Sequence, residues 1–445
     1  MSAGTAHRAF TLAAEDLHHC LVDSSLDGIT MLNEIASRYP QAVSFAPGWP
    51  PDEEFNPDQA DYFIRRFTEY LAKEEGCETD LALGRRLFQY GPTAGTIRGL
   101  IARWLAADEN IHVDPAAIVV TVGSSEAMTA VVRCLFSDPS DVLLVQSPSY
   151  FGVVGASRIL GVDVVAVPEG PAGIEAATVE RVCAEVRASG RRPRALYTIP
   201  DHANPSGLSL TVPARERLLE MAARENLPLI EDSPYRYFTR TGERLPTLKS
   251  LDTAGMVIYL GSFSKICAPG VRVGFAIADQ PITRSDNPDQ PHHLLADELA
   301  KVKSVLTVNT SPVTQAIIGG MLIDADYRLT AYTAARAALA AERLEAMLAA
   351  LRRELGPMQE KLPELSWTEP DGGFFISLSV PFDADLAALE QSAAQFGVLW
   401  CPMSLFHVDG GGGRQMRLAS SYASPERIDL GVSRLAEFIR HQVDS

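Results

Sequence analysis

A lysine at position 265 stands in a run of small residues that could hold an aldehyde and a phosphate together. Ser262 and Ser264 precede Lys265, and Arg272 follows a short distance along the chain. A lysine whose pKa is lowered by burial or by a nearby positive charge can form an imine with an aldehyde. Arginine binds phosphate through paired hydrogen bonds and keeps its charge. The segment therefore indicates pyridoxal phosphate (PLP), although an ordinary solvated loop could have the same composition.

A carboxylate at the end of an apolar run could bind the opposite end of such a cofactor. Asp232 closes a short apolar run, where α/β sheets place their ligand sites. A protonated pyridine nitrogen would be the cation that a buried carboxylate needs, and protonation makes the ring an electron sink. Asp232 could instead cap a helix, and Glu231 should point to the other face and be structural. Tyr235 could bond the phenolic oxygen of the ring or be a core tyrosine.

Further polar residues follow other apolar runs. Ser124 and Ser125 open a helix after the run 118–122, where backbone N–H groups and the helix dipole attract anions. They could equally be helix caps, and no G-x-G-x-x-G nicotinamide fingerprint is present. Asn204, held extended before a proline, could donate to the phenolic oxygen or belong to a common turn. Tyr150 could stack on the cofactor or cover the sheet edge.

Three more side chains complete the set, and two of them have two interpretations each. Arg417 lies in an apolar run and requires a carboxylate, which is either that of a substrate or an internal ion-pair partner. His202 titrates near neutral pH and could be an extra acid or base, or it could pack beside the cofactor. Tyr90 stands in a segment that is, in isolation, an ordinary loop.

The elements that must position these residues alternate between strands and helices. Short continuous apolar runs separated by helical stretches are typical of a mostly parallel sheet covered on both faces. A polar excursion over 279–293 precedes a helical stretch over 294–355, which leads into a smaller α+β domain. We expect an arm and part of the small domain over 1–75, a large cofactor-binding domain over 76–325 and the small domain over 326–445. The runs that predict strands are 118–122, 142–146, 162–167, 195–198, 227–231, 257–261 and 273–278.

Composition excludes several classes of function. The chain has 445 residues, is 46% hydrophobic, and carries 39 basic against 56 acidic residues for a formal charge of -17. This charge disfavours nucleic acids and anionic membranes as partners. We see neither a signal peptide nor a membrane span, and the six cysteines form no metal-binding pattern. We therefore expect a cytoplasmic protein without a metal.

Taken together, these motifs resemble the fold-type I, PLP-dependent aminotransferases of class I/II, and the resemblance extends from Phe45 to about Ile439. It implies a large domain with a mostly parallel seven-stranded sheet and a smaller α+β domain. By this resemblance Lys265 forms the imine and moves protons, Asp232 meets the pyridine nitrogen, and Asn204 and Tyr235 donate to the phenolic oxygen.

The resemblance assigns the remaining roles as well. Tyr150 would stack on the ring, and Arg417 would bind the substrate carboxylate beside the Gly48 backbone. We also place His202 near the substrate. Tyr90 would reach the cofactor of a neighbouring subunit, which implies a homodimer. The phosphate would be held by Ser124, Ser125, Ser262 and Arg272, and Ser264 would also bind the cofactor.

Within the family, the segments 43–48, 87–91 and 308–312 are most similar to aminotransferases that make arylglycines such as dihydroxyphenylglycine for natural products, and more distantly to the aminoadipate group. We expect transfer of an amino group between an amino acid and a 2-keto acid. The alternatives are β- or γ-elimination, replacement or carbon-carbon bond formation on the same cofactor, and a PLP-binding regulator. Departures from the family pattern lie at Ser125, His202, Ser233 and Arg236, around the expected reactive face.

Overall fold

The central sheet contains all seven predicted strands. In the computed structural model, which describes residues 11–22, 24–283 and 293–444, the strands run in the order β2-β8-β7-β6-β5-β3-β4. All neighbours are parallel except β8, which is antiparallel to both β2 and β7. The strands are β2 (Ile118–Thr121), β3 (Asp141–Ser147), β4 (Asp163–Pro168), β5 (Arg192–Thr198), β6 (Leu229–Asp232), β7 (Val257–Ser262) and β8 (Gly274–Ile277).

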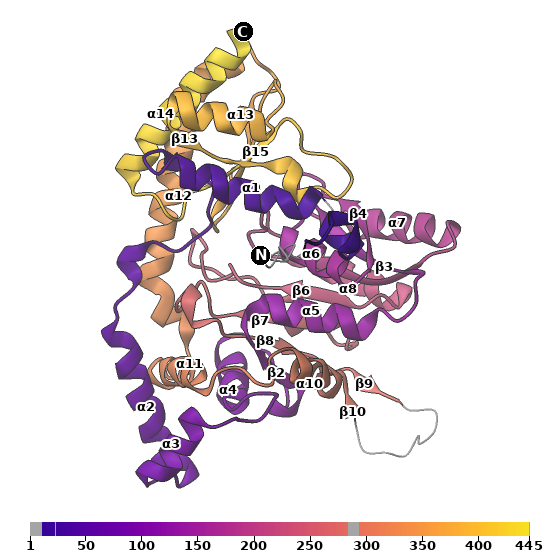
Figure 1. The fold of residues 1–445 in the computed structure, drawn as a ribbon, viewed down its shortest axis with the longest axis vertical. Coiled ribbons are helices and arrows are strands. Elements are labelled where there is room, and N and C mark those ends of the chain that lie inside the picture. The colour runs from indigo at the N-terminus through magenta and orange to yellow at the C-terminus, as the bar shows by residue number, and fades with distance from the viewer. Residues whose placement is uncertain (1–10, 23, 284–292, 445) are drawn as a thin grey trace, which may run out of the picture.

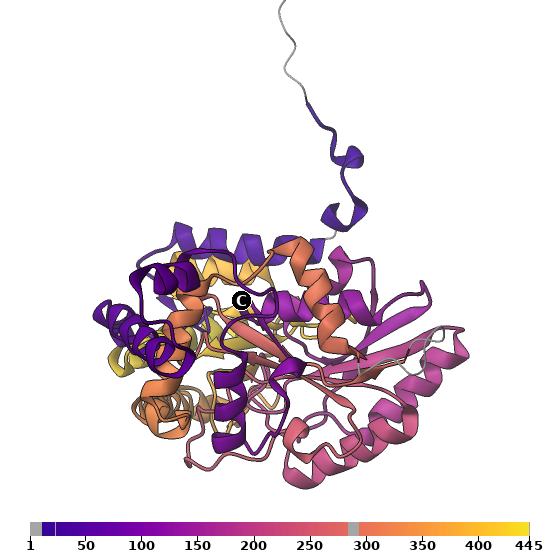
Figure 2. The same cartoon turned by 90° about the horizontal axis from the view of Figure 1, so that it is seen from below.

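Helices cover both faces of this sheet (Figures 1 and 2). Side chains alternate between the two faces of a strand, so Leu143 and Val145 of β3 join one apolar cluster and Val142 and Leu144 join another. The first cluster includes side chains of α4 to α6, and the second includes side chains of α7 and α8. The helices of this domain are α2 (Asp58–Glu75), α3 (Asp80–Phe88), α4 (Arg98–Asp108), α5 (Gly123–Leu135), α6 (Phe151–Ile159), α7 (Ala176–Ala188), α8 (Val212–Glu225), α9 (Leu248–Leu251), α10 (Leu295–Leu306) and α11 (Pro312–Asp324).

A smaller domain is built on an antiparallel sheet of order β11-β12-β15-β14. The N-terminal strand β1 pairs with β13 in parallel, so the segment that carries α1 and β1 belongs to this domain, as Figure 1 shows for the indigo helix α1 beside the yellow C-terminal elements. The elements are α1 (Ser24–Arg38), β1 (Val43–Ser44), β11 (Ser366–Trp367), β12 (Phe375–Ser379), α13 (Leu386–Gln391), β13 (Val398–Leu399), β14 (Cys401–Pro402), β15 (Gln415–Ala419) and α14 (Pro425–Asp444).

One long helix, α12 (Leu329–Gln359), connects the two domains. Leu329 packs in the core of the large domain, whereas Leu344 packs in the core of the small domain. The passage between domains therefore falls inside α12, and not at residue 325 as predicted. The predicted arm 1–75 is divided in the same way, because Phe45 joins the small core and Phe63 the large one.

The polar excursion at 279–293 begins and ends in a two-stranded hairpin. Strand β9 (Pro281–Ile282) pairs with β10 (His293–Leu294) in antiparallel orientation, and residues 284–292 between them lie outside the described part of the chain. Within the described part, no helix is both long and apolar enough to cross a membrane.

Candidate active site

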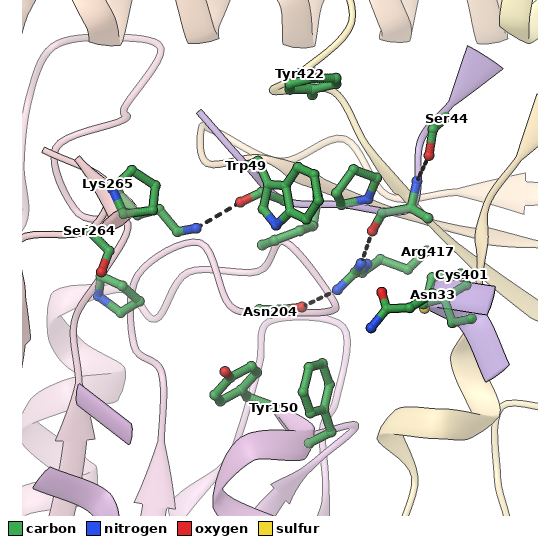
Figure 3. A pocket seen from close by; sticks show the side chains of 18 of the residues that line it. Asn33, Ser44, Trp49, Tyr150, Asn204, Ser264, Lys265, Cys401, Arg417 and Tyr422 are labelled. Atoms are coloured by element: carbon green, nitrogen blue, oxygen red, sulfur yellow. Dashed lines mark hydrogen bonds between the residues drawn. The ribbon is translucent and has the colours of Figure 1, made fainter. Parts of the chain in front are cut away.

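A cavity of about 650 Å³ lies between the two domains, at the carboxyl ends of the parallel strands (Figure 3). The sequence-predicted residues that line it come from the large domain, the small domain and the segment after β1. They are Gly48, Ser124, Ser125, Tyr150, Asn204, Asp232, Tyr235, Ser262, Ser264, Lys265, Arg272 and Arg417. Parallel strands end at one edge of a sheet, which is why the large-domain residues meet here, whereas Gly48 and Arg417 reach the cavity from the segment after β1 and from β15.

Lys265 stands on a single turn that follows β7. The N–H of Cys267 donates to the carbonyl of Phe263 (2.9 Å) and closes this turn. The amine Nζ of Lys265 donates to the Gly48 carbonyl across 2.8 Å, so its partner is neutral. Burial lowers the pKa of Lys265 to about 8, and the charges of Arg417 and Arg272 act in the same direction. An appreciable share of this amine is therefore unprotonated near neutral pH, as imine formation requires.

Asp232 presents one carboxylate oxygen without a partner. The hydroxyl of Tyr197 donates to Oδ2 of Asp232 across 2.7 Å, while Oδ1 is buried and accepts no hydrogen bond. Burial raises the pKa of this carboxyl to about 6, and the bonds from Tyr197 and the Ser233 backbone lower it. An unpaired buried oxygen on a carboxylate fits a cationic N–H donor, such as a protonated pyridine nitrogen.

A cradle for an anion is formed where α5 begins. Gly123 has a φ of +73°, and a Cβ at this position would lie 2.3 Å from Nη2 of Arg272, so only glycine admits the guanidinium here. Nη1 of Arg272 donates to the Ser264 hydroxyl across 3.3 Å. The N-cap residue of α5 is Val122, and no side chain caps the helix, so the capping interpretation of Ser124 and Ser125 does not hold. Exposed helix N–H groups beside an arginine suit a phosphate.

Tyr150, Asn204 and Tyr235 line the same cavity as Lys265 and Asp232. Tyr235 is fixed by edge-to-face contacts with Phe374 and Phe375, at ring-centroid distances of 5.5 and 5.3 Å. Burial raises its pKa, and its hydroxyl also interacts with the Asn204 side chain. The ring of Tyr150 packs over the start of α6, where a Cβ on Gly152 would lie 2.3 Å from it.

Arg417 is a buried cation without a carboxylate partner among the described residues. Its Nη1 donates to Oδ1 of Asn204 (2.9 Å), its Nη2 donates to the Ala46 carbonyl, and its Nε has no partner. The guanidinium lies over the rings of Phe375 and Phe406, 4.8 Å from each centroid. The described residues thus provide no internal ion pair, and the arginine retains the capacity to bind an incoming carboxylate.

His202 does not line the cavity, which corrects its predicted place beside the substrate. Its φ is +50°, and its ring lies against the loop that precedes β12, where a Cβ on Gly372 would lie 2.7 Å from Cε1 of the ring. A Cβ on Gly373 would lie 2.4 Å from the His202 Cβ, and Nδ1 of the ring lies 3.1 Å from the Ser209 hydroxyl. Burial lowers the pKa of this histidine. The packing interpretation therefore describes His202, although its neighbour is the small-domain loop.

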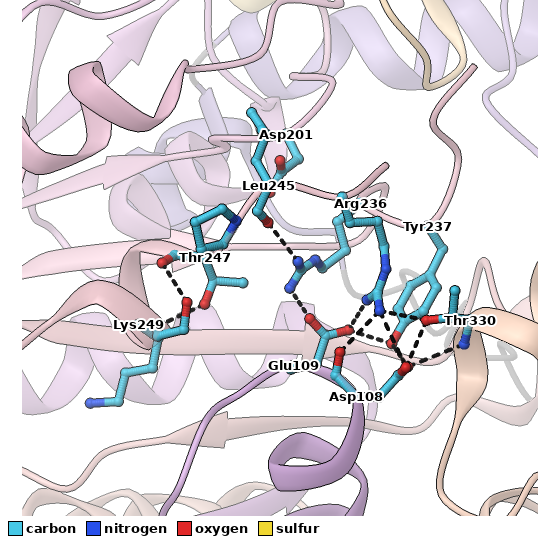
Figure 4. A network of polar contacts seen from close by, with 12 residues as sticks. Asp108, Glu109, Asp201, Arg236, Tyr237, Leu245, Thr247, Lys249 and Thr330 are labelled. Atoms are coloured by element: carbon cyan, nitrogen blue, oxygen red, sulfur yellow. Dashed lines mark hydrogen bonds and ion pairs between the residues drawn. The ribbon is translucent and has the colours of Figure 1, made fainter. Parts of the chain in front are cut away.

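Arg236 also points away from the cavity. It pairs with the buried Glu109, and its Nη2 donates to the Leu245 carbonyl across 2.9 Å (Figure 4). Arg244 joins the same carboxylate, and the Tyr237 hydroxyl donates to Asp108 (2.8 Å). This departure from the family pattern therefore belongs to a polar network beneath the site, and not to its reactive face.

Tyr90 does not line the cavity, and 79% of its surface is exposed. Sequence reasoning missed several residues that do belong to the site. Tyr197 is one of them, since it does not line the cavity but donates to Asp232, and its position one residue before the end of β5 could have indicated it. The lining also includes the aromatic residues Trp49, Phe151, Phe375, Phe406 and Tyr422.

Comparisons with known proteins agree with this geometry. The family described as aminotransferase class I and II matches residues 66–435. The chain belongs to this family. It is 41% identical to (S)-3,5-dihydroxyphenylglycine transaminase of Amycolatopsis orientalis over 428 residues, which cover 96% of this chain and 94% of that protein.

Solved structures of other aminotransferases have the same fold. The multiple substrate aminotransferase of Thermococcus profundus superimposes with a TM-score of 0.79 at 26% identity, covering 97% of this chain and 98% of the other. LysN, the α-aminoadipate aminotransferase of Thermus thermophilus, has a TM-score of 0.75 at 29% identity, with 96% and 100% covered; its structure contains N-(5'-phosphopyridoxyl)-L-leucine. This class I/II aminotransferase accordingly uses PLP and acts on amino acids and keto acids.

Proposed function

We propose that this aminotransferase acts on a 2-amino acid whose aromatic ring is attached directly to Cα, such as dihydroxyphenylglycine, with a 2-keto acid as the acceptor. The observation that carries the proposal is the composition of the cavity wall. Aromatic side chains surround the space beside Arg417, and the cations that the described lining contains are Lys265, Arg272 and Arg417. A second substrate carboxylate would have no cation left in this subunit, which disfavours aminoadipate. The 41% identity to the dihydroxyphenylglycine transaminase supports the same substrate class.

The proposed roles of the residues follow from their partners. When bound, PLP supplies an electron sink for the bond that breaks at the substrate Cα. Arg417 holds the substrate carboxylate beside the Gly48 backbone, and this places Cα toward Nζ of Lys265, which accepts and returns the proton. Asp232 keeps the pyridine nitrogen protonated through its unpaired Oδ1.

The remaining side chains orient the cofactor. We assign the donation of hydrogen bonds to the phenolic oxygen to Asn204 and Tyr235, and a stacking contact to Tyr150, because all three line the cavity together with Lys265 and Asp232. The phosphate is assigned to Ser124, Ser125, Ser262, Ser264 and Arg272. This arrangement aligns Lys265 with the substrate Cα.

A homodimer is the second part of the proposal. Tyr90 and Phe88 are each 79% exposed, and the adjoining Gly91 approaches Asn309 and Pro312, next to the half-exposed Val308. Large apolar side chains gathered on one surface indicate an interface, and the family resemblance assigns Tyr90 to a partner's cofactor. Phe88→Glu should yield inactive monomers by analytical ultracentrifugation, whereas Leu430→Glu, at another exposed apolar position, should leave the dimer and its activity intact. An active Phe88→Glu monomer would contradict the assignment.

We also place the enzyme in the cytoplasm. All six cysteines are free thiols, which suits a reducing compartment.

The substrate is tested with a panel of amino donors. Dihydroxyphenylglycine, phenylglycine, phenylalanine, aminoadipate and glutamate are each supplied with several 2-keto acids, and products are identified by mass spectrometry. We expect arylglycines to give their keto acids with the highest kcat/KM, and Trp49→Ala to lower this value for arylglycines more than for glutamate. Preference for aminoadipate would overturn the substrate class, and release of ammonia without a new amino acid would favour elimination.

A further inference from the structure

Two arginines of α12 lie on one face of the helix and reach both halves of the site. Arg336 and Arg343 are separated by about two helical turns, so their side chains point in similar directions. Around Arg336 the helix still packs on the large domain, whose core includes Ala340. Next to Arg343 it enters the small domain, whose core begins at Leu344.

Arg336 binds the backbone of the lysine turn. Its Nη1 donates to the carbonyls of Ile266 (2.7 Å) and Cys267 (2.8 Å), the two residues after Lys265. The carbonyls at the end of a helical turn have no partner within the turn, so this guanidinium completes their hydrogen bonding. The peptide segment that carries the reactive amine is thereby attached to α12.

Arg343 binds the backbone that follows the strand of Arg417. Its Nη1 donates to the carbonyl of Ser421 across 2.6 Å and to that of Tyr422 across 3.3 Å, and the side chain is buried. Tyr422 in turn lines the cavity and meets Trp49 edge-to-face, with ring centroids 6.1 Å apart (Figure 3). The end of β15 is therefore attached to the same helix.

Other arginines of α12 behave differently. Arg352 and Arg353 are about half exposed and pair with the carboxylates of Glu369 and Asp429. Exposed pairs of this kind contribute little to stability. These two residues show what a surface arginine on this helix does, and Arg353 provides a matched control.

We propose that Arg336 and Arg343 are positioning residues that together set the separation between the amine of Lys265 and the carboxylate-binding guanidinium of Arg417. Because α12 is hydrogen-bonded to the backbone of both segments, a movement of one domain against the other cannot change this distance without breaking those bonds. The inference goes beyond the reaction itself but rests on the proposed roles of Lys265 and Arg417.

The test compares Arg336→Met, Arg343→Met and the control Arg353→Met as PLP-loaded enzymes. Each is measured for kcat, KM, thermal unfolding and the pH midpoint of the absorbance change of bound PLP. Arg336→Met should lower kcat by roughly tenfold to a hundredfold and shift the midpoint, because a small displacement of Nζ alters both alignment and its distance from Arg272. Arg343→Met should raise KM by roughly tenfold and leave the midpoint unchanged. Arg353→Met should change neither.

The lysine variants keep the inference testable if a methionine variant fails to fold. Arg336→Lys and Arg343→Lys retain a charged donor and should recover part of the lost kcat and KM respectively. The inference is wrong if both methionine variants behave like Arg353→Met. It is also wrong if they lose thermal stability while Arg336→Met leaves kcat unchanged and Arg343→Met leaves KM unchanged. Lys265→Ala and Arg417→Ala are run alongside. If Lys265→Ala still formed an imine with PLP, or Arg417→Ala still bound the amino donor with unchanged affinity, the proposed function would be wrong instead.

Discussion

Arg417 and Asn204 are joined by a hydrogen bond from Nη1 to Oδ1 across 2.9 Å. The bond links the proposed carboxylate site to a proposed donor to the cofactor. Because the carbonyl oxygen of Asn204 accepts from the guanidinium, the amide NH2 group is the part of this side chain that can donate elsewhere. Arg417 therefore orients the Asn204 side chain, the proposed cofactor donor, before a substrate binds.

Asn204→Asp should convert this contact into an internal ion pair. The new carboxylate would compete with the substrate carboxylate for Arg417 and could no longer donate a hydrogen bond. We expect KM for the amino donor to rise by roughly tenfold to a hundredfold, since a charge-assisted hydrogen bond contributes about 1.5–3 kcal/mol. Steady-state kinetics measure this effect, and Asn204→Ala separates loss of the donor from gain of the charge. An unchanged KM in Asn204→Asp would argue against carboxylate binding at Arg417.

Tyr197→Phe should weaken the proposed interaction between Asp232 and the pyridine nitrogen of PLP. The Tyr197 hydroxyl donates to Oδ2 of Asp232 and stabilises the charged carboxylate, so its removal raises the carboxyl pKa further above its present value of about 6. We expect the dissociation constant of PLP to increase by roughly tenfold, the equivalent of one hydrogen bond to a charged group. Titration of the apoenzyme with PLP provides the measurement. Tyr259→Phe, at another buried strand tyrosine, is the control and should bind PLP normally.

A buried carboxyl on the other face of β6 predicts how stability depends on pH. Glu231 accepts hydrogen bonds from the N–H groups of Leu248 and Lys249, yet burial raises its pKa from 4.5 to about 7. Because the pKa of this carboxyl is higher in the folded state than in the unfolded state, its protonated form stabilises the fold. Its contribution to the free energy of unfolding is complete below pH 4.5, decreases as pH rises, and is lost above about pH 7. The free energy of unfolding that is lost is about 3 kcal/mol, because each pKa unit corresponds to about 1.36 kcal/mol.

Glu231→Gln should remove much of this dependence in the apoenzyme. The melting temperature of the wild type should decrease between about pH 5 and 8, while that of the variant should change less over the same range. Glu216→Gln, on the exposed face of α8, serves as the control. A wild-type melting temperature that rises over this range would contradict the assignment to Glu231.

The sequence was sufficient for the strands and for twelve of the residues that line the cavity. Lys265, Asp232 and Ser124 each lie at or just after the end of β7, β6 and β2, three strands that run in the same direction, so their convergence depends on the sheet alone. Arg417 could be selected because an arginine in an apolar strand requires a partner. These predictions used local pattern and a general property of α/β sheets.

Other features required tertiary information. The partner of Tyr197 is fixed by the register of β5 on β6, which pairs Tyr197 with Ile230 and which no local pattern specifies. His202 was misplaced because its backbone conformation and the distant Gly373 decide where the ring lies. The domain boundary was placed before α12 because an uninterrupted helical pattern does not show which core each turn joins.

The central claim, that Lys265 carries PLP, has a direct test among the buried lysines. Nζ of Lys249 is 2.7 Å from Oδ1 of Asp279, and Nζ of Lys303 is 2.8 Å from Oε2 of Glu126, so both amines are held by carboxylates. The acceptor of Lys265 is only a carbonyl. Borohydride reduction of the yellow PLP-loaded enzyme, followed by peptide mapping, should place the pyridoxyl group on Lys265. A label on Lys249, Lys303 or any other lysine would contradict the account.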